Sequence, residues 1–111
     1  MSSFNLFDTG KIYVCTEPVS WRYRIKGLDI FARSKLNLDL RNTKAWLIVF
    51  NKQRNSLRAL HYDTRTIVLY ERKLLENKYI QILQKDILQE LSKEQLLMLF
   101  KSSSKGIAIS T

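Results

Sequence analysis

Few residues of this sequence are of the types that carry out catalysis. His61 is the only histidine, so an acid–base mechanism of the usual kind would depend on it alone. It shares one face of an expected strand with Leu57 and Ala59, a placement typical of a packed histidine with a single hydrogen bond. Cys15, the only cysteine, lies in another expected strand with no base nearby in the sequence. We therefore expect a buried, unreactive thiol, and a single cysteine excludes both an intrachain disulfide and a zinc site built from several cysteines.

The carboxylates and glycines do not form a recognisable site either. Nuclease and strand-transfer chemistry commonly holds two metal ions with several carboxylates, but the aspartates lie scattered at positions 8, 29, 39, 63 and 86. Asp29 is expected to form a salt bridge on a helix, and Asp63 to cap a turn. Three glycines, at 10, 27 and 106, are too few and too far apart for a phosphate-binding loop. We expect no enzyme, no metal, no cofactor and no small-molecule substrate.

Positive charge is the property of the sequence that points to a partner. The 111 residues include 19 Lys and Arg against 10 Asp and Glu, a net charge of +9. Nearly all of the excess lies between residues 22 and 58. A localised positive field favours polyanions, because each phosphate contacted releases condensed counterions. DNA is the expected partner, and the alternative is a basic surface that docks an acidic protein or only maintains solubility.

The candidate binding residues are cations set among aromatic rings. A first stripe, on an expected helix, comprises Arg22, Lys26 and Arg33. A second stripe, on expected hairpins, comprises Lys52, Arg54, Arg58, Arg72 and Lys73. Such cations clamp phosphates, and Tyr62 and Tyr70 are candidate rings for stacking on exposed bases. The alternative is that Tyr70 belongs to the core and the cations are only solvated.

The N-terminal elements follow from hydrophobic periodicity. β-formers at 12–14 predict a short strand that Pro18 ends. Apolar residues that recur at steps of three and four over 21–36 predict an amphipathic helix, with Ser20 as its N-cap. Gly27 weakens this helix, which indicates close packing against a neighbour at that position.

The middle of the chain predicts strands. Residues 45–50 are apolar, rich in β-formers and too short for a helix, so they predict a buried central strand. Strands over 57–63 and 67–72 follow, each after a segment with turn chemistry. These lengths predict a three-stranded antiparallel meander.

The C-terminal third is expected to complete a single domain. Residues 79–83 fit either a further strand or the start of a helix. A capping box at 92–95 predicts a last helix over about 93–101. We expect one α+β domain over 1–101, in which a three- to four-stranded antiparallel sheet packs against the N-terminal helix and the C-terminal helix. A flexible tail is expected over 102–111.

The sequence contains no sign of membrane insertion or export. The longest unbroken apolar run covers only residues 45–50, far short of the ~18 residues that span a bilayer. Residues 1–8 contain no basic segment leading into an apolar one, so no secretory signal is expected. We expect a cytoplasmic protein without a membrane partner.

Several segments resemble one known family in their order and spacing. They are 16–22 (TEPVSWR), 26–28 (KGL), 57–63 (LRALHYD) and 72–79 (RKLLENKY). Over roughly residues 11–101 the chain resembles the TnpB-type accessory protein, the product of the second reading frame, of the IS66 group of bacterial insertion sequences. The resemblance implies a non-catalytic accessory role in transposition, in the bacterial cytoplasm. It also implies the element's large transposase as a protein partner and assembly on DNA as the task.

Overall fold

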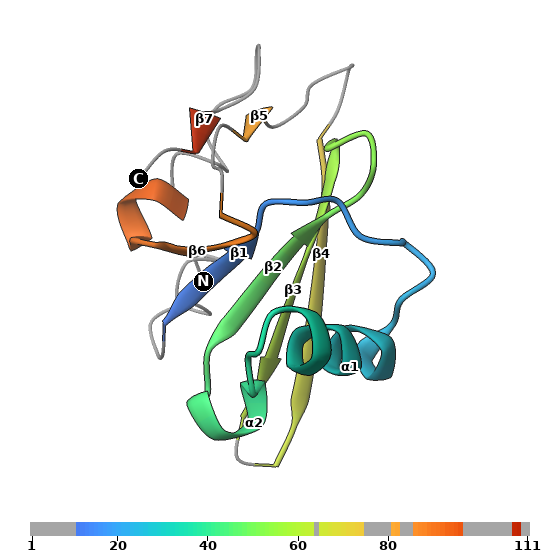
Figure 1. Ribbon diagram of the computed structural model, residues 1–111, viewed down its shortest axis with the longest axis vertical. Coiled ribbons are helices and arrows are strands. Elements are labelled where there is room, and N and C mark those ends of the chain that lie inside the picture. The colour runs from blue at the N-terminus through green and yellow to red at the C-terminus, as the bar shows by residue number, and fades with distance from the viewer. Residues whose placement is uncertain (1–10, 64, 75–80, 83–85, 97–107, 110–111) are drawn as a thin grey trace.

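The strands of the protein form one main sheet and a small second pair. The computed structural model describes residues 11–63, 65–74, 81–82, 86–96 and 108–109. The main sheet has five strands in the order β4-β3-β2-β1-β6 (Figure 1). Its strands are β1 (Ile12–Cys15), β2 (Trp46–Phe50), β3 (Ser56–Tyr62), β4 (Ile67–Lys73) and β6 (Leu88–Leu91). Two short strands, β5 (Gln81–Ile82) and β7 (Ala108–Ile109), pair parallel with each other, and the helices are α1 (Ile25–Lys35) and α2 (Leu40–Thr43).

The sheet is mixed, which corrects part of the expected architecture. The α+β class is confirmed, and β2, β3 and β4 pair antiparallel in succession. The expected sheet of three to four strands, all antiparallel, is wrong. β1 runs parallel to β2, and β6 pairs antiparallel with the other edge of β1. Parallel neighbours need a long crossover connection, and the segment with α1 and α2 provides it between β1 and β2.

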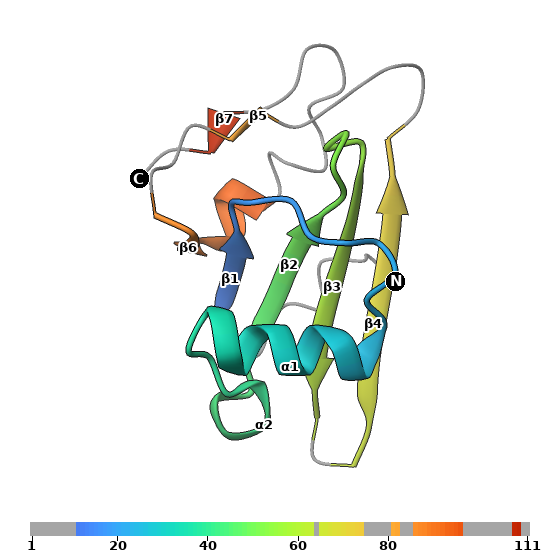
Figure 2. The same ribbon diagram turned by 45° about the vertical axis from the view of Figure 1, so that its right-hand side comes forward.

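The main sheet is covered on both faces, and residues of β2 alternate between two cores. Trp46, Ile48 and Phe50 belong to a cluster that includes Leu91 and Leu96 from the C-terminal part of the chain. The other face is covered by α1, which crosses the strands near the end where α2 lies (Figure 2). β2 is a continuous apolar run because side chains on both of its faces are buried. This confirms the buried central strand that the sequence predicted.

α1 begins later than the sequence indicated. The Ser20 hydroxyl accepts a hydrogen bond from the Arg22 amide at 3.3 Å, and the Ser20 carbonyl accepts one from the Tyr23 amide at 3.1 Å. These bonds close a turn ahead of the helix, whose N-cap is Arg24 without a side-chain bond. The expected Ser20 N-cap is therefore wrong. A Cβ at Gly27 would lie 3.3 Å from the Cβ of Tyr23, so the glycine permits the expected close packing, here against the turn.

The expected C-terminal helix begins where the sequence predicted, at residue 93. The Ser92 amide donates to Gln95 Oε1 at 2.8 Å, and the Gln95 amide donates to Ser92 Oγ at 3.1 Å, which confirms the capping box. Residues 93–96 are helical, and the rest of the expected helix lies outside the described residues. So does the expected tail, except that Ala108–Ile109 form β7. Within the described residues, no helix is long and apolar enough to cross a membrane.

Candidate nucleic-acid interface

Arg58, a member of the expected second stripe, lies inside the molecule. It is 5% exposed, and its Nε donates to Glu71 Oε1 on the neighbouring strand β4 at 2.9 Å. Its Nη1 donates to the carbonyls of Trp21 at 2.9 Å and Tyr23 at 3.0 Å, and its guanidinium lies 4.2 Å from the centroid of the Trp21 ring. These contacts fasten the turn before α1 to the sheet. Because these contacts bury the guanidinium inside the protein, Arg58 is not part of the candidate binding surface.

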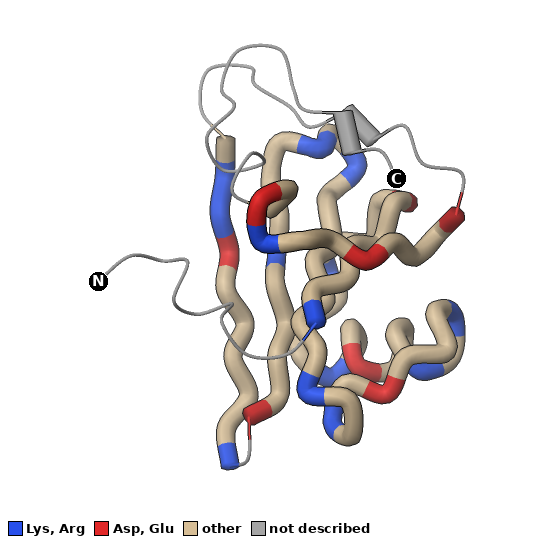
Figure 3. Tube along the Cα trace, turned by 90° about the vertical axis from the view of Figure 1, so that its left-hand side faces the viewer, with Lys and Arg blue, Asp and Glu red and all other residues tan. Residues whose placement is uncertain are grey.

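The other four cations of the second stripe gather at one end of the sheet. Pairing of β3 with β4 places Ser56 opposite Lys73 and Leu57 opposite Arg72. The β2–β3 loop, residues 51–55, is therefore next to the C-terminal end of β4, and the Leu74 amide donates to the Asn55 carbonyl at 2.7 Å. Figure 3 shows blue segments of the chain at this end of both the loop and β4. We call this group the hairpin rim; its members are Lys52, Arg54, Arg72 and Lys73.

The arginines of the hairpin rim are held in place by hydrogen bonds. Arg54 Nη1 donates to the Thr16 carbonyl at 3.0 Å. Arg72 donates from Nε and Nη2 to the Tyr70 hydroxyl oxygen, at 3.2 Å and 2.9 Å. Both arginines are half-buried, whereas Lys52 and Lys73 are exposed. The rim thus combines two positioned guanidinium groups with two lysines that extend into solvent.

The loop that carries the rim is closed by Asn51. Asn51 Oδ1 accepts hydrogen bonds from the amides of Asn55 and Ser56, each at 3.0 Å. Its Nδ2 donates to Asn55 Oδ1 at 2.7 Å. A side chain that satisfies several backbone groups of one loop limits the conformations open to that loop. Lys52 and Arg54 are therefore carried by an ordered turn.

The first stripe lies apart from the hairpin rim. Arg22, Lys26 and Arg33 are all exposed, on α1 and the turn before it. Arg33 Nη2 lies 3.2 Å from Oδ2 of Asp29, so the expected salt bridge of Asp29 is confirmed. Figure 2 shows α1 away from the end that carries the β2–β3 loop. The structure therefore does not join the two stripes into one surface.

The two candidate stacking rings are involved in packing. Tyr62 is 6% exposed and belongs to the core under α1, with the Arg41 guanidinium 5.2 Å from the centroid of its ring. Tyr70 is half-buried and packs against the other core cluster. Its hydroxyl also holds Arg72. Tyr70 therefore serves the rim by positioning a cation.

Three cations at the opposite end of the sheet were missed by the sequence reasoning. Arg41 lies in α2, Lys44 directly follows α2, and Arg65 lies in the turn between β3 and β4. The turn itself was expected from residues 63–66, and its Asp63 amide donates to the Thr66 carbonyl at 2.8 Å. Nothing in the local pattern, however, indicated that this turn lies beside α2, because that neighbourhood depends on how the strands pair.

The only histidine and the only cysteine of the sequence are both packed inside the protein. The His61 ring stacks on Trp46 with centroids 4.4 Å apart, and its Nδ1 lies 3.3 Å from the Ala45 carbonyl oxygen, which confirms a packed histidine. Cys15 is buried as expected, and burial raises the pKa of its thiol. Across the part of the chain that the structure describes, no three His, Cys, Asp or Glu side chains are grouped so that they could hold a metal ion.

Comparison with known proteins identifies the family. The model of the family described as IS66 Orf2-like protein matches residues 10–108, which is nearly the whole chain. No curated protein and no solved structure gives a significant match. The matched range includes all five strands of the main sheet, the hairpin rim and α2. The chain therefore belongs to the IS66 Orf2-like protein family, which fits an accessory protein of an insertion sequence.

Proposed function

We propose that this protein assists transposition by holding DNA through phosphate contacts at the hairpin rim, without catalysing a reaction itself. Membership of the family supports the accessory role, with the element's large transposase as its protein partner. The observation that carries the DNA contact is the β3–β4 register, which brings four cations from two segments to one end of the sheet. Cations grouped in this way neutralise neighbouring phosphates and release their counterions.

The charge balance around the hairpin rim favours a polyanion. Glu71 lies next to Arg72 in sequence, but its carboxylate is bonded to the buried Arg58. Glu17 is an exposed acid in the segment that Arg54 contacts, so four cations face one carboxylate among these residues. Neither α1 nor α2 lies at this end of the sheet (Figure 2). The rim is therefore suited to phosphate positioning and not to reading bases.

The salt dependence of duplex binding tests this proposal. Four phosphate contacts predict that affinity falls about 100-fold between 50 and 200 mM salt. A Lys52→Glu/Lys73→Glu variant removes two contacts, so its loss over the same range should be only about tenfold. Both changes are at exposed positions, which leaves the core intact. Fluorescence anisotropy of a labelled duplex at several salt concentrations measures both slopes.

A variant on α1 provides the matched control. Arg24→Glu/Lys35→Glu lowers the net charge by the same amount at two exposed positions, the N-cap and the last residue of α1, which belong to neither stripe. It should keep the steep salt dependence of the unchanged protein. Equal flattening by both variants would show that total charge decides binding and would contradict the rim. No binding of duplex at 50 mM salt would overturn DNA contact and favour an adaptor that docks an acidic protein.

A further inference from the structure

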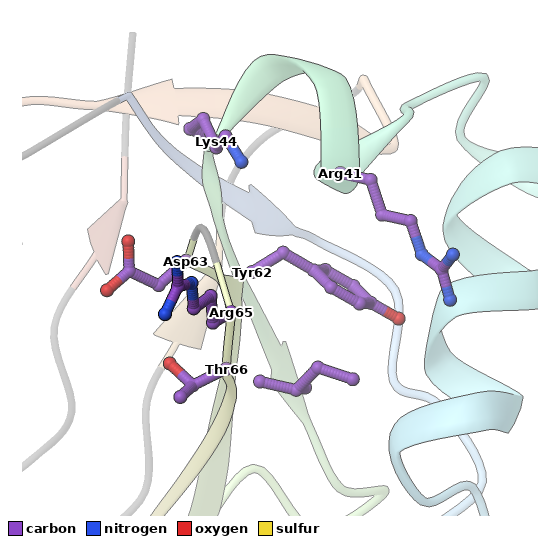
Figure 4. Close-up of a pocket in the computed structure, with 7 residues that line it drawn as sticks. Arg41, Lys44, Tyr62, Asp63, Arg65 and Thr66 are labelled. Atoms are coloured by element: carbon purple, nitrogen blue, oxygen red, sulfur yellow. The ribbon is translucent and has the colours of Figure 1, made fainter.

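The end of the sheet opposite the hairpin rim contains a pocket that the proposed function does not use. Its volume is about 260 Å³, below the roughly 300 Å³ at which pockets for drug-sized ligands begin. It is formed by α2, by the residue after α2, by the end of β3 with the following turn and by Ile67 at the start of β4. We call it the α2 pocket; Figure 4 shows its lining residues Arg41, Lys44, Tyr62, Asp63, Arg65 and Thr66.

Arg41 is positioned by both its backbone and its side chain. Asp39 Oδ1 accepts hydrogen bonds from the amides of Arg41 at 3.2 Å and Asn42 at 3.4 Å, so it caps α2. The Arg41 guanidinium lies against the Tyr62 ring, at 5.2 Å from its centroid. A guanidinium held on an aromatic face keeps its N–H groups directed outward at the ring's edge. Arg41 is therefore preorganised at one side of the pocket.

Lys44 occupies a backbone conformation that favours glycine. Its φ is 58° and its ψ is 24°, in the left-handed region, and its amide donates to the Leu40 carbonyl at 3.1 Å. Glycine fits this position after a helix with less strain than any residue that has a Cβ. A strained residue in a pocket lining is a sign that its side chain serves a purpose there. The exposed lysine at this position is consistent with a ligand contact.

We propose that the α2 pocket binds the phosphate group of a nucleotide, either a monoester or a diester. The lining has three cations and the Thr66 hydroxyl against one acid, Asp63. In Figure 4 the Arg41 guanidinium lies at the hydroxyl end of Tyr62, and Lys44, Arg65 and the Asp63 carboxylate lie on the other side of the ring. Guanidinium and ammonium groups from separate segments match an anion that has several acceptor oxygens. The pocket is at the other end of the sheet from the hairpin rim, so this inference stands apart from duplex binding at the rim.

The test uses short nucleotides and the full chain. The ¹⁵N-labelled protein is titrated with thymidine dinucleotide, with and without a 5′-phosphate, and the amide resonances of Lys44, Arg65 and Thr66 are followed. A Lys44→Gly variant suits the left-handed backbone, so it keeps the fold while it removes one cation. We expect it to weaken dinucleotide binding about tenfold, the effect of losing one charge-assisted contact. Arg65→Gln should weaken binding by a similar factor.

The controls separate the pocket from general charge and from the hairpin rim. Lys35→Gln removes one exposed positive charge on α1 and should leave dinucleotide binding unchanged, as should Lys52→Glu/Lys73→Glu at the rim. Binding of only the 5′-phosphorylated dinucleotide would assign the pocket to a terminal monoester, and equal binding of both would assign it to a diester. The proposal is overturned if neither dinucleotide shifts these resonances, if Lys35→Gln weakens binding as much as Lys44→Gly, or if a diglutamate peptide binds equally well.

Discussion

The two ends of the sheet present positive charge in different ways. At the hairpin rim, cations from the β2–β3 loop and β4 surround an open end. At the α2 pocket, cations from α2, from the residue after it and from the β3–β4 turn line a small pocket that opens to solvent. Each end includes one cation in the left-handed backbone region, Arg54 and Lys44, both with φ of 58°. Each is also supported by one capping side chain, Asn51 at the rim and Asp39 at the pocket.

Both ends are positively charged, so the shape of each site, more than its charge, decides which of the two proposed ligands it suits. An open rim can follow successive phosphates of a backbone, whereas a pocket admits one discrete group. Arg58 adds a third case, since it is surrounded by protein midway along β3. The same kind of side chain therefore contacts solvent at the ends and supports the fold in the middle. Substitutions at the three places should separate these roles.

The largest effect is expected from Arg58→Met, because this buried side chain donates three hydrogen bonds inside the protein. The variant leaves the carbonyls of Trp21 and Tyr23 without their donor and removes the bond to Glu71. We expect the free energy of unfolding to fall by about 3 kcal/mol, as for the loss of one partner of a buried charged network. Urea denaturation measures it.

Arg54→Met is the matched control for Arg58→Met. Among the described residues, the Arg54 side chain donates a single hydrogen bond, to the Thr16 carbonyl, and it is half-buried in the β2–β3 loop. Its loss should cost about 1 kcal/mol. If both variants lost the same stability, the distinction between a supporting arginine and a rim arginine would be wrong.

An intermediate effect is expected from Asn51→Ala, confined to the hairpin rim. The variant removes the acceptor for two loop amides, at a cost of about 1–2 kcal/mol. Duplex affinity should fall, because Lys52 and Arg54 lose their ordered support, while dinucleotide binding at the α2 pocket stays unchanged. Gln53→Ala, at an exposed position of the same loop, should change stability by less than about 0.5 kcal/mol. A loss of dinucleotide binding in Asn51→Ala would contradict the independence of the two ends.

Local sequence patterns predicted those parts of the fold that depend on neighbouring residues in the chain. The consecutive strands β2, β3 and β4 could be placed because short runs of β-formers alternate with segments of turn chemistry. The packed His61, the buried Cys15 and the Asp29 salt bridge also depend on immediate neighbours or on one strand face. Each of these expectations is confirmed.

Non-local pairing set the limits of the sequence reasoning. β1 joins the sheet parallel to β2 across a long connection, and no local pattern specifies that partner. All residues of β3 are buried, so the strand has no alternation of apolar and polar faces. The sequence therefore contained no sign that Arg58 packs against the Trp21 ring. For the same reason the α2 pocket was missed, because it arises only when the β3–β4 turn is placed beside α2. The four cations of the hairpin rim could be grouped from the sequence because the loop and the strand that carry them belong to consecutive hairpins.

A small loss of stability is expected from Asp39→Ala, which gives the sharpest test of the α2 pocket. Asp39 is half-buried and caps a helix of a single turn, so its loss should cost only about 0.5–1 kcal/mol. The Asp39 carboxylate also offsets the positive charge of the cations near it.

If charge alone attracted the ligand, removing that carboxylate would strengthen dinucleotide binding. If the position of Arg41 matters, binding should weaken instead, because the cap that orients α2 is gone. Asp39→Asn keeps an acceptor oxygen without the charge, so it should bind at least as well as the unchanged protein. Titration of the three proteins with the same dinucleotide decides the matter: tighter binding by Asp39→Ala would mean that the pocket attracts anions without positioning them.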